Sequence, residues 1–453
     1  MKFAMSEGQK RFYKDLAALV IPISIQNLLT NAVNSADVFM LGYVGQSALS
    51  AVSLANQFQF ILGGFFFGIT SGITMLASQY WGKKDTDSIQ TVMGIAMKIS
   101  FVICLIIFCG AVFAPEVLMK IYTNDAELIA IGASYLRVIG TSYLLMSVSQ
   151  VYLCILRSTE RAKISTAISS TALILNIALN AVFIFGLFGM PKLGVVGVAI
   201  ATVISRVVEV VLCVVDMMRG KSFQVKLSTV FARNKLLFQD YLKYSIPALT
   251  NDILWTLAFS TYSIIMGHMN SDVVAASSVA TTVRDLLTIV CYGLSSGGSV
   301  LLGIEIGEGR MEHAKKDASR LCHATFVFGV LTGLLILATR PLVFACFQLS
   351  GRAYEYLNIM LVISSYYVVG QTMNTVTIAG IFRAGGDSRF GMICDAVIMW
   401  CICVPLGFLS AFVFKLPPMA VYFILCLDEF WKIPVVYHHY KSYKWLKDIT
   451  RDF

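Results

Sequence analysis

The chain has 453 residues, of which 57% are hydrophobic and only 13% are charged, and its formal net charge is +9. Because soluble domains carry about 25% charged residues, this composition excludes an ordinary soluble protein and indicates a membrane protein with apolar surface for lipid. The positive charge does not imply a nucleic acid partner, since most basic residues lie in the segments that separate apolar runs.

Residues 1–15 form a basic, amphipathic segment that we predict to be cytoplasmic. The segment lacks the short apolar core and the small-residue cleavage site of a secretory signal peptide. We therefore expect the apolar run that follows it to remain in the protein as a membrane helix.

Twelve apolar runs are long enough to cross a bilayer, for which about 20 residues are needed. The longest hydrophilic connection, a cytoplasmic linker at 219–241, separates an N-terminal lobe at 16–218 from a C-terminal lobe at 242–440, and a cytoplasmic tail follows at 441–453. The predicted spans are 16–41, 47–80, 91–114, 128–156, 165–188, 193–218, 242–267, 272–305, 320–347, 354–382, 390–414 and 418–440.

Lysine and arginine residues are concentrated in alternate loops between these runs, for example in "GKKDTD" and in "GRMEHAKKDASR". Cytoplasmic loops of membrane proteins carry such an excess of positive charge. We therefore predict a multi-pass protein of the cell membrane with both termini in the cytoplasm.

The two lobes repeat each other in sequence when residue n is aligned with residue n+225, without gaps, from Ile21 to Gly82. Matches of glycine and proline are informative because backbone geometry demands these residues. They include Pro22 with Pro247, Gly42 with Gly267, Gly68 with Gly293, Gly72 with Gly297 and Gly82 with Gly307. Six spans per lobe keep both repeats in the same orientation.

The repeat predicts an all-α integral membrane protein with twelve transmembrane helices in two six-helix bundles, related by a pseudo-two-fold axis along the membrane normal. This architecture is typical of transporters that rock one bundle against the other. It disfavours an ion channel, which usually repeats as subunits around a pore and needs a filter loop.

Asp37 places a carboxylate in a first span otherwise suited to lipid, where a charge costs about 2.5–3.5 kcal/mol. Asn176 and Asn180 are four residues apart in the fifth span and share a helix face, while Thr202 lies in the sixth span. Carboxylate, amide and hydroxyl oxygens suit a proton relay or a small hard cation, such as Na+ at Asp37, Asn176 and Asn180. Alternatively, these side chains only hydrogen-bond the helices together.

A second set of charges lies within spans of the C-terminal lobe. It consists of Asp252, Arg284, Asp285 and Asp395. Asp252 and Asp395 could bind an ion or form structural contacts, and both interpretations stay open. We expect Arg284 to pair with Asp285.

Other charges are expected to have structural roles. In the sixth span, Arg206 is predicted to pair with Glu209, three residues along the helix. Lys98, Asp428 and Glu429 lie near span ends, so we expect them to extend toward the membrane surface.

A substrate cleft between the lobes would use aromatic rings and methionine sulfur to hold flat organic cations, together with a few polar groups. For any single residue, ordinary packing is the competing interpretation. The candidates are Gln26, Asn34, Tyr262, Met266, Gln371 and Asn374.

Cysteine and histidine give no sign of a cofactor or metal centre. Most of the eleven cysteines lie within apolar spans without a C-x-x-C pair, and the five histidines are scattered. The spans also lack a catalytic constellation such as H-E-x-x-H. We therefore expect no enzyme activity, no catalytic residues and no cofactor other than a coupling ion.

The chain resembles the multidrug and toxic compound extrusion (MATE) family along essentially its whole length. The motifs that carry the resemblance are "NSADVFMLGYVG", "ASQYWGKKD", "LRSTERAK", "LNIALNAVFIFGLFG" and "FRAGGDSRF", in this order. The resemblance implies a bacterial antiporter that expels organic cations or amphiphilic drugs in exchange for Na+ or H+. We expect it to act as a monomer.

The resemblance also implies that Asp37, Asn176, Asn180 and Thr202 form the ion or proton site. Many bacterial members have a second aspartate where this chain has Asn180, so the choice between Na+ and H+ stays open. The alternative function is a lipid or lipid-linked oligosaccharide flippase of the same superfamily. It would need a strongly basic cavity, for which only Arg206 and Arg284 are candidates.

Overall fold

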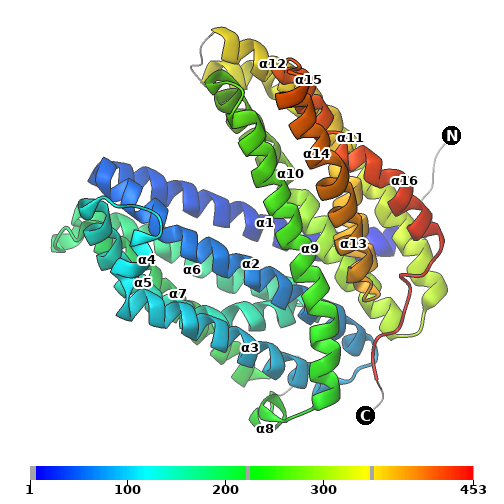
Figure 1. The fold of residues 1–453 in the computed structure, drawn as a ribbon. Coiled ribbons are helices and arrows are strands. Elements are labelled where there is room, and N and C mark those ends of the chain that lie inside the picture. Colours follow the sequence, from blue (N-terminus) through cyan, green and yellow to red (C-terminus); the bar gives the residue numbers. More distant parts are fainter. Residues whose placement is uncertain (1–6, 221–224, 347–350, 452–453) are drawn as a thin grey trace. The chain divides into compact units, whose positions relative to one another are not determined.

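The computed structural model describes residues 7–220, 225–346 and 351–451, and within these ranges the chain is helical without β-strands (Figure 1). The helices of the first half are α1 (Glu7–Val44), α2 (Gln46–Gly82), α3 (Thr86–Phe113), α4 (Pro115–Lys120), α5 (Ala126–Ser158), α6 (Ala162–Phe185), the short 3-10 helix η1 (Leu187–Gly189), α7 (Gly194–Arg219) and α8 (Leu227–Phe231).

The helices of the second half include three π-helical segments, η2, η3 and η4. In chain order they are α9 (Lys235–Gly267), α10 (Ser271–Gly307), α11 (Met311–Cys346), α12 (Gly351–Thr375), η2 (Val376–Phe382), α13 (Ser388–Asp395), η3 (Ala396–Cys403), α14 (Val404–Phe408), η4 (Leu409–Val413), α15 (Pro418–Leu425) and α16 (Asp428–Lys441).

The described residues fall into two compact units. The N-terminal unit comprises 25–77 and 84–242, and within it α5 packs against α3 and α7, and α6 packs against α7. The C-terminal unit comprises the described residues of 1–24, 78–83 and 243–453. Within it α10 packs against α11, α12 and η2, while α16 packs against α12 and η3.

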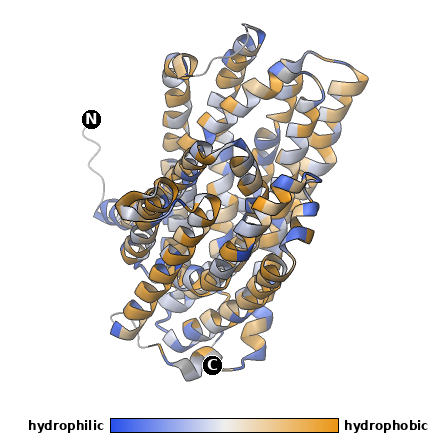
Figure 2. Cartoon of the chain, turned by 90° about the vertical axis from the view of Figure 1, so that its left-hand side faces the viewer, coloured by the Kyte–Doolittle hydropathy of each residue, from blue (hydrophilic) through white to orange (hydrophobic). Residues whose placement is uncertain are grey.

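Nine described helical segments are long and apolar enough to cross a membrane, and Figure 2 shows hydrophobic residues along most of the helices. They are α1, α2, α3, α5, α6, α7, α10, α11 and the continuous run from α13 to η4. The other three predicted spans correspond to α9, to α12 with η2, and to α15 with α16. The last of these is interrupted at residues 426–427, so neither of its helices alone has the length of a span.

Within the C-terminal unit, the end of α2 crosses α10 at glycines that the sequence repeat brings into register. A Cβ atom at Gly82 would collide with the backbone carbonyl of Ile304, and one at Gly307 would collide with the backbone of Gln79. Small residues allow two membrane helices to approach closely. The matched glycines therefore mark a helix crossing at which neither backbone has room for a side chain.

Replacing Gly307 with alanine is expected to destabilise the protein, because backbone atoms of α2 must move to admit the methyl group. Overpacking of this kind costs about 1–3 kcal/mol. We expect a lower melting temperature in detergent, measured by intrinsic fluorescence. Gly64→Ala is the matched control, since a Cβ atom there would meet no atom within 4 Å. Equal melting temperatures for the two variants would contradict the close crossing.

The segment after α16 packs onto the end of α2. The Gln79 side-chain amide donates to the carbonyl oxygens of Ala384 (2.7 Å) and Lys447 (3.1 Å), and its oxygen accepts from the Ile449 N–H (2.9 Å). Trp445 is fully buried, and its indole N–H donates to the Tyr440 carbonyl. The end of the described chain is thus an integral part of the C-terminal unit.

Candidate ion-coupling site

Four polar side chains from three helices of the N-terminal unit form one hydrogen-bonded chain. The Asn180 Nδ2 atom donates to Asp37 Oδ1 at 2.6 Å and to Asn176 Oδ1 at 3.2 Å. The Asn176 Nδ2 atom in turn donates to Thr202 Oγ1 at 3.1 Å. The structure therefore brings together the four residues that the sequence selected, from α1, α6 and α7.

Helix geometry explains why α6 contributes two side chains to this cluster. Asn176 and Asn180 are one turn apart, so both amides project from the same face. Thr202 is anchored on α7 by a hydrogen bond from its hydroxyl to the Val198 carbonyl at 3.0 Å. Two of the polar positions are thus set by local helical geometry, and the packing of α6 against α7 brings in the third.

One buried oxygen of the cluster accepts no hydrogen bond from any residue that the structure describes. Asn180 is completely buried, yet its Oδ1 atom has no hydrogen-bond partner in the described part of the chain. A buried acceptor left unpaired is costly, by about 1–3 kcal/mol. Together with the half-buried Asp37 carboxylate, this oxygen fits a small cation or a proton donor. The donor set is therefore suited to Na+ or H+, the ions expected from the sequence.

Tyr135 is a neighbour that the sequence reasoning missed. It is almost fully buried on α5, interacts electrostatically with Asp37, and donates its hydroxyl proton to Asn56 Oδ1 at 3.1 Å. The sequence has 19 tyrosines, so a single tyrosine within a span does not stand out as a candidate for the site. Only packing of α5 within the unit reveals that it lies near the carboxylate.

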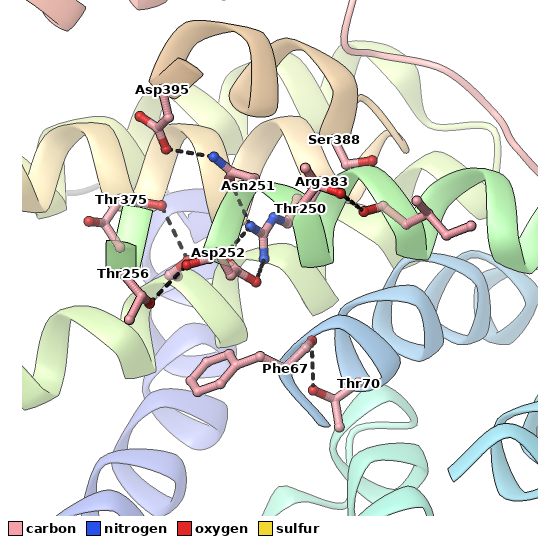
Figure 3. Close-up of polar contacts among 12 residues, drawn as sticks. Phe67, Thr70, Thr250, Asn251, Asp252, Thr256, Thr375, Arg383, Ser388 and Asp395 are labelled. Carbon is pink, nitrogen blue, oxygen red and sulfur yellow. Dashed lines mark hydrogen bonds and ion pairs between the residues drawn. The ribbon is translucent and has the colours of Figure 1, made fainter. Parts of the chain in front are cut away.

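In the C-terminal unit, Asp252 forms a salt bridge with Arg383, as Figure 3 shows. The Arg383 guanidinium donates to both Asp252 oxygens, at 2.7 and 3.3 Å, and to Asn251 Oδ1 at 3.0 Å. The amide of Asn251 donates to Asp395 Oδ2 at 2.5 Å. Asp252 therefore has a positive partner on the segment between η2 and α13, which the sequence reasoning did not identify.

The prediction that Asp428 and Glu429 extend toward the membrane surface is wrong. Asp428 is 0% exposed and Glu429 is 2% exposed, because α16 packs against α12 and η3. Lys432, one turn further along α16, is also buried, and its Nζ atom lies 2.9 Å from Asp395 Oδ1 and 3.3 Å from Glu429 Oε1. The Asn374 amide donates to Glu429 Oε2 at 2.8 Å.

The predicted pair Arg206–Glu209 is confirmed, with 2.7 Å between guanidinium and carboxylate. Arg284 and Asp285 also interact, at 3.6 Å. The Arg284 guanidinium additionally lies near the ring of Tyr367, 5.3 Å from its centroid. Both basic residues considered for a flippase cavity therefore have an acidic neighbour.

The candidate substrate residues belong to different units. Gln26 and Asn34 lie in the N-terminal unit, where Gln26 donates to Ser169 at 3.0 Å and Asn34 is exposed. The other four, all buried in the C-terminal unit, are Tyr262, Met266, Gln371 and Asn374. Asn374 is bound to Glu429, as described above.

Comparisons with known proteins agree with the repeat. The family model MatE matches the chain twice, at residues 22–182 and 247–409. The two matches begin at Pro22 and Pro247, which are separated by the same 225 residues as the repeat. The family unit is therefore one lobe, and the chain contains two copies.

Relatives from Bacillus subtilis and Rhizobium meliloti match most of the chain. "Uncharacterized transporter YisQ" is 24% identical over 95% of this chain and 95% of its own length. "Probable multidrug resistance protein YoeA" is 24% identical, covering 97% and 96%. The "Probable multidrug resistance protein NorM" of Rhizobium meliloti is 25% identical, covering 88% and 86%.

Solved structures share the fold at low sequence identity. A structure titled as an outward-facing conformation of a multidrug resistance MATE family transporter superposes with a TM-score of 0.85 at 18% identity, covering 99% of this chain and 100% of that one. A transporter of the MOP superfamily from Pyrococcus furiosus gives 0.84 at 18% identity, covering 97% and 98%. The chain therefore belongs to the MatE family of membrane transporters, has its all-α fold of twelve transmembrane helices in two six-helix bundles, and is not an enzyme.

Proposed function

We propose that the protein is a secondary active multidrug efflux transporter that exports organic cations or amphiphilic drugs in exchange for external Na+ or H+. The observation that carries this proposal is the hydrogen-bonded cluster around Asp37, in which the buried Asn180 Oδ1 accepts no hydrogen bond from the described residues. Relatives named as multidrug resistance proteins support the substrate class. We place the protein in the cell membrane as a monomer with cytoplasmic termini.

The proposed cycle couples the ion to the substrate through two conformations. Substrate binds from the cytoplasm to an inward-open state, and a rocking of the bundles converts this state to an outward-open one. An external ion occupies the Asp37 cluster, and this occupancy disfavours the substrate-bound state. Substrate leaves, the protein resets inward and the ion is released. Only a difference in the affinity of the two states for ion and substrate drives such a cycle.

The alternative function, flipping of a lipid-linked oligosaccharide, has less support in the described residues. Recognition of a pyrophosphate would use unpaired arginines or lysines. Arg206 is paired with Glu209, and Arg284 lies beside Asp285 and against an aromatic ring. Antiport of a cationic or amphiphilic drug therefore remains the better proposal.

Transport in proteoliposomes tests this function. Vesicles containing the protein and loaded with ethidium would be exposed to a Na+ gradient and, separately, to a H+ gradient. Ethidium movement driven by one gradient and abolished by the matching ionophore is the expected result, and it identifies the coupling ion. Absence of movement under both gradients, with ethidium and with a second lipophilic cation such as tetraphenylphosphonium, would contradict multidrug antiport.

A further inference from the structure

A buried carboxylate in the C-terminal unit, that of Asp428, has no hydrogen-bond partner among the residues that the structure describes. Asp428 is 0% exposed, and neither of its oxygens forms a hydrogen bond with any described group. The backbone N–H of its chain neighbour Glu429 interacts with the carboxylate but does not meet hydrogen-bond geometry. Such a group contrasts with Asp395 and Glu429 nearby, which both contact Lys432.

The charges around Asp428 do not balance if every carboxyl group is ionised. Three carboxylates, Asp395, Asp428 and Glu429, share one ammonium group, that of Lys432. Arg383 does not correct the excess, because it is paired with Asp252.

Other titratable groups that interact electrostatically with Asp428 supply no further positive charge. They come from α9, α12, η3 and the break before α16. The arginine next to these groups, Arg284, lies over the Tyr367 ring and beside Asp285. These groups are Tyr262, Tyr367, Cys403 and Cys426.

The position of the Lys432 ammonium group argues against a metal ion at this site. Its Nζ atom already occupies the place between Asp395 and Glu429 where a cation would sit. In the described part of the chain, no three His, Cys, Asp or Glu side chains are grouped as metal ligands. The remaining negative charge is a single carboxylate that accepts no hydrogen bond from the described residues, and a proton is the smallest cation that neutralises it.

Apolar side chains dominate a cavity of about 370 Å³ next to α16. It is lined by Leu427, the chain neighbour of Asp428, by Cys403, which interacts electrostatically with Asp428, and mostly by leucine, isoleucine and aromatic side chains. Such side chains cannot replace the hydrogen bonds that a carboxylate makes with water. An unpaired buried charge costs far more than a neutral polar group, so the surroundings favour the acid over the carboxylate.

We propose that Asp428 is a second proton-binding site of this transporter, in the C-terminal unit and separate from the Asp37 cluster. One proton from water adds to the carboxylate to give the neutral acid, and the same proton returns to water when the site becomes accessible. The site goes beyond the proposed function, which needs only one ion at Asp37.

Irregular helices around Asp428 are suited to opening such a site. The break at residues 426–427 immediately precedes it, and the π-helical segment η3 packs against α16. Interrupted helices and π-helical segments often occur at functional sites of membrane proteins. A small change at the break would alter the access of water to Asp428 without unfolding either helix.

Infrared spectroscopy of the protein in lipid nanodiscs tests the proposal directly. At neutral pH, the wild-type protein should show the C=O stretch of a protonated carboxylic acid, and this band should shift in D2O because the proton exchanges. Asp428→Asn has almost the same shape as the acid and should remove the band. Labelling aspartate with 13C at the carboxyl group should move the band, which separates Asp428 from any glutamic acid.

Asp37→Asn is the control, because it alters the other proposed ion site and should leave the Asp428 band in place. Spectra of the wild type and Asp428→Asn that differ only in the carboxylate region would overturn the proposal, as would a band that does not shift in D2O. If Asp428→Asn fails to fold, Asp428→Glu replaces it, and the expected result is a band that no longer responds to the aspartate label. Since no transport is measured, failure of this test is distinguishable from failure of the antiporter proposal.

Discussion

Asp37→Asn is expected to abolish ion-driven efflux while leaving the protein folded. The asparagine keeps the size of the side chain but removes the negative charge, so the cluster can neither exchange a proton nor neutralise Na+. Interactions of a charged group are worth about 1.5–3 kcal/mol, which corresponds to a loss of affinity of about tenfold or more. The initial rate of gradient-driven ethidium transport in proteoliposomes measures the effect.

Asp15→Asn is the matched control for this experiment. Asp15 is on the same helix, is about half exposed, and pairs only with Arg11 one turn away, so its loss should change neither the transport rate nor the melting temperature. Size-exclusion profiles and melting temperatures of both variants should match those of the wild type. If Asp37→Asn retained the full ion-driven rate, Asp37 would not be the coupling residue.

The cluster around Asp37 shows what sequence reasoning can reach. A carboxylate in an apolar span is conspicuous because of its cost, and the spacing of Asn176 and Asn180 places both on one helix face. The contact of Asn180 with Asp37 depends on how α1 and α6 pack, which spacing within one helix does not determine. Resemblance to a family supplied that step, and the 2.6 Å hydrogen bond agrees with it.

The C-terminal unit shows where sequence reasoning fails. Asp428 and Glu429 were expected near the membrane surface because hydropathy reports the length of a span and not which of its faces is buried. Arg383 was overlooked as a partner of Asp252 because "FRAGGDSRF" looks like an ordinary basic loop. In both cases tertiary packing overrides the local pattern: it pairs Arg383 with Asp252, 131 residues away in the chain, and it buries α16 against α12 and η3.

The repeat illustrates a second limit. The glycines of the two lobes match in sequence, and Gly82 and Gly307 meet at one helix crossing in the C-terminal unit. The polar side chains nevertheless differ between the lobes, since Asp37 corresponds to Tyr262 at the 225-residue offset. Duplication preserves the backbone geometry that folding needs, whereas the polar side chains within each lobe are free to diverge.

Lys432→Met is expected to cause a severe loss of stability. The ammonium group lies 2.9 Å from Asp395 and 3.3 Å from Glu429, and all three side chains are at most 6% exposed. Removing one partner of a buried ion pair leaves an uncompensated charge and typically costs about 3–5 kcal/mol. We expect a large drop in melting temperature and in the monodisperse fraction on size-exclusion chromatography.

Lys441→Met on the same helix is the control, because Lys441 is exposed and its ammonium group lies over the ring of Tyr437. Combining Lys432→Met with Asp395→Asn should recover part of the lost stability, since the second change removes one of the two negative charges left without a positive partner. A double variant no more stable than Lys432→Met would mean that Asp395 does not depend on Lys432. If Lys432→Met were as stable as the wild type, Asp395 and Glu429 would have to be neutral acids. Protons, and not the Lys432 ammonium group, would then neutralise these two carboxylates.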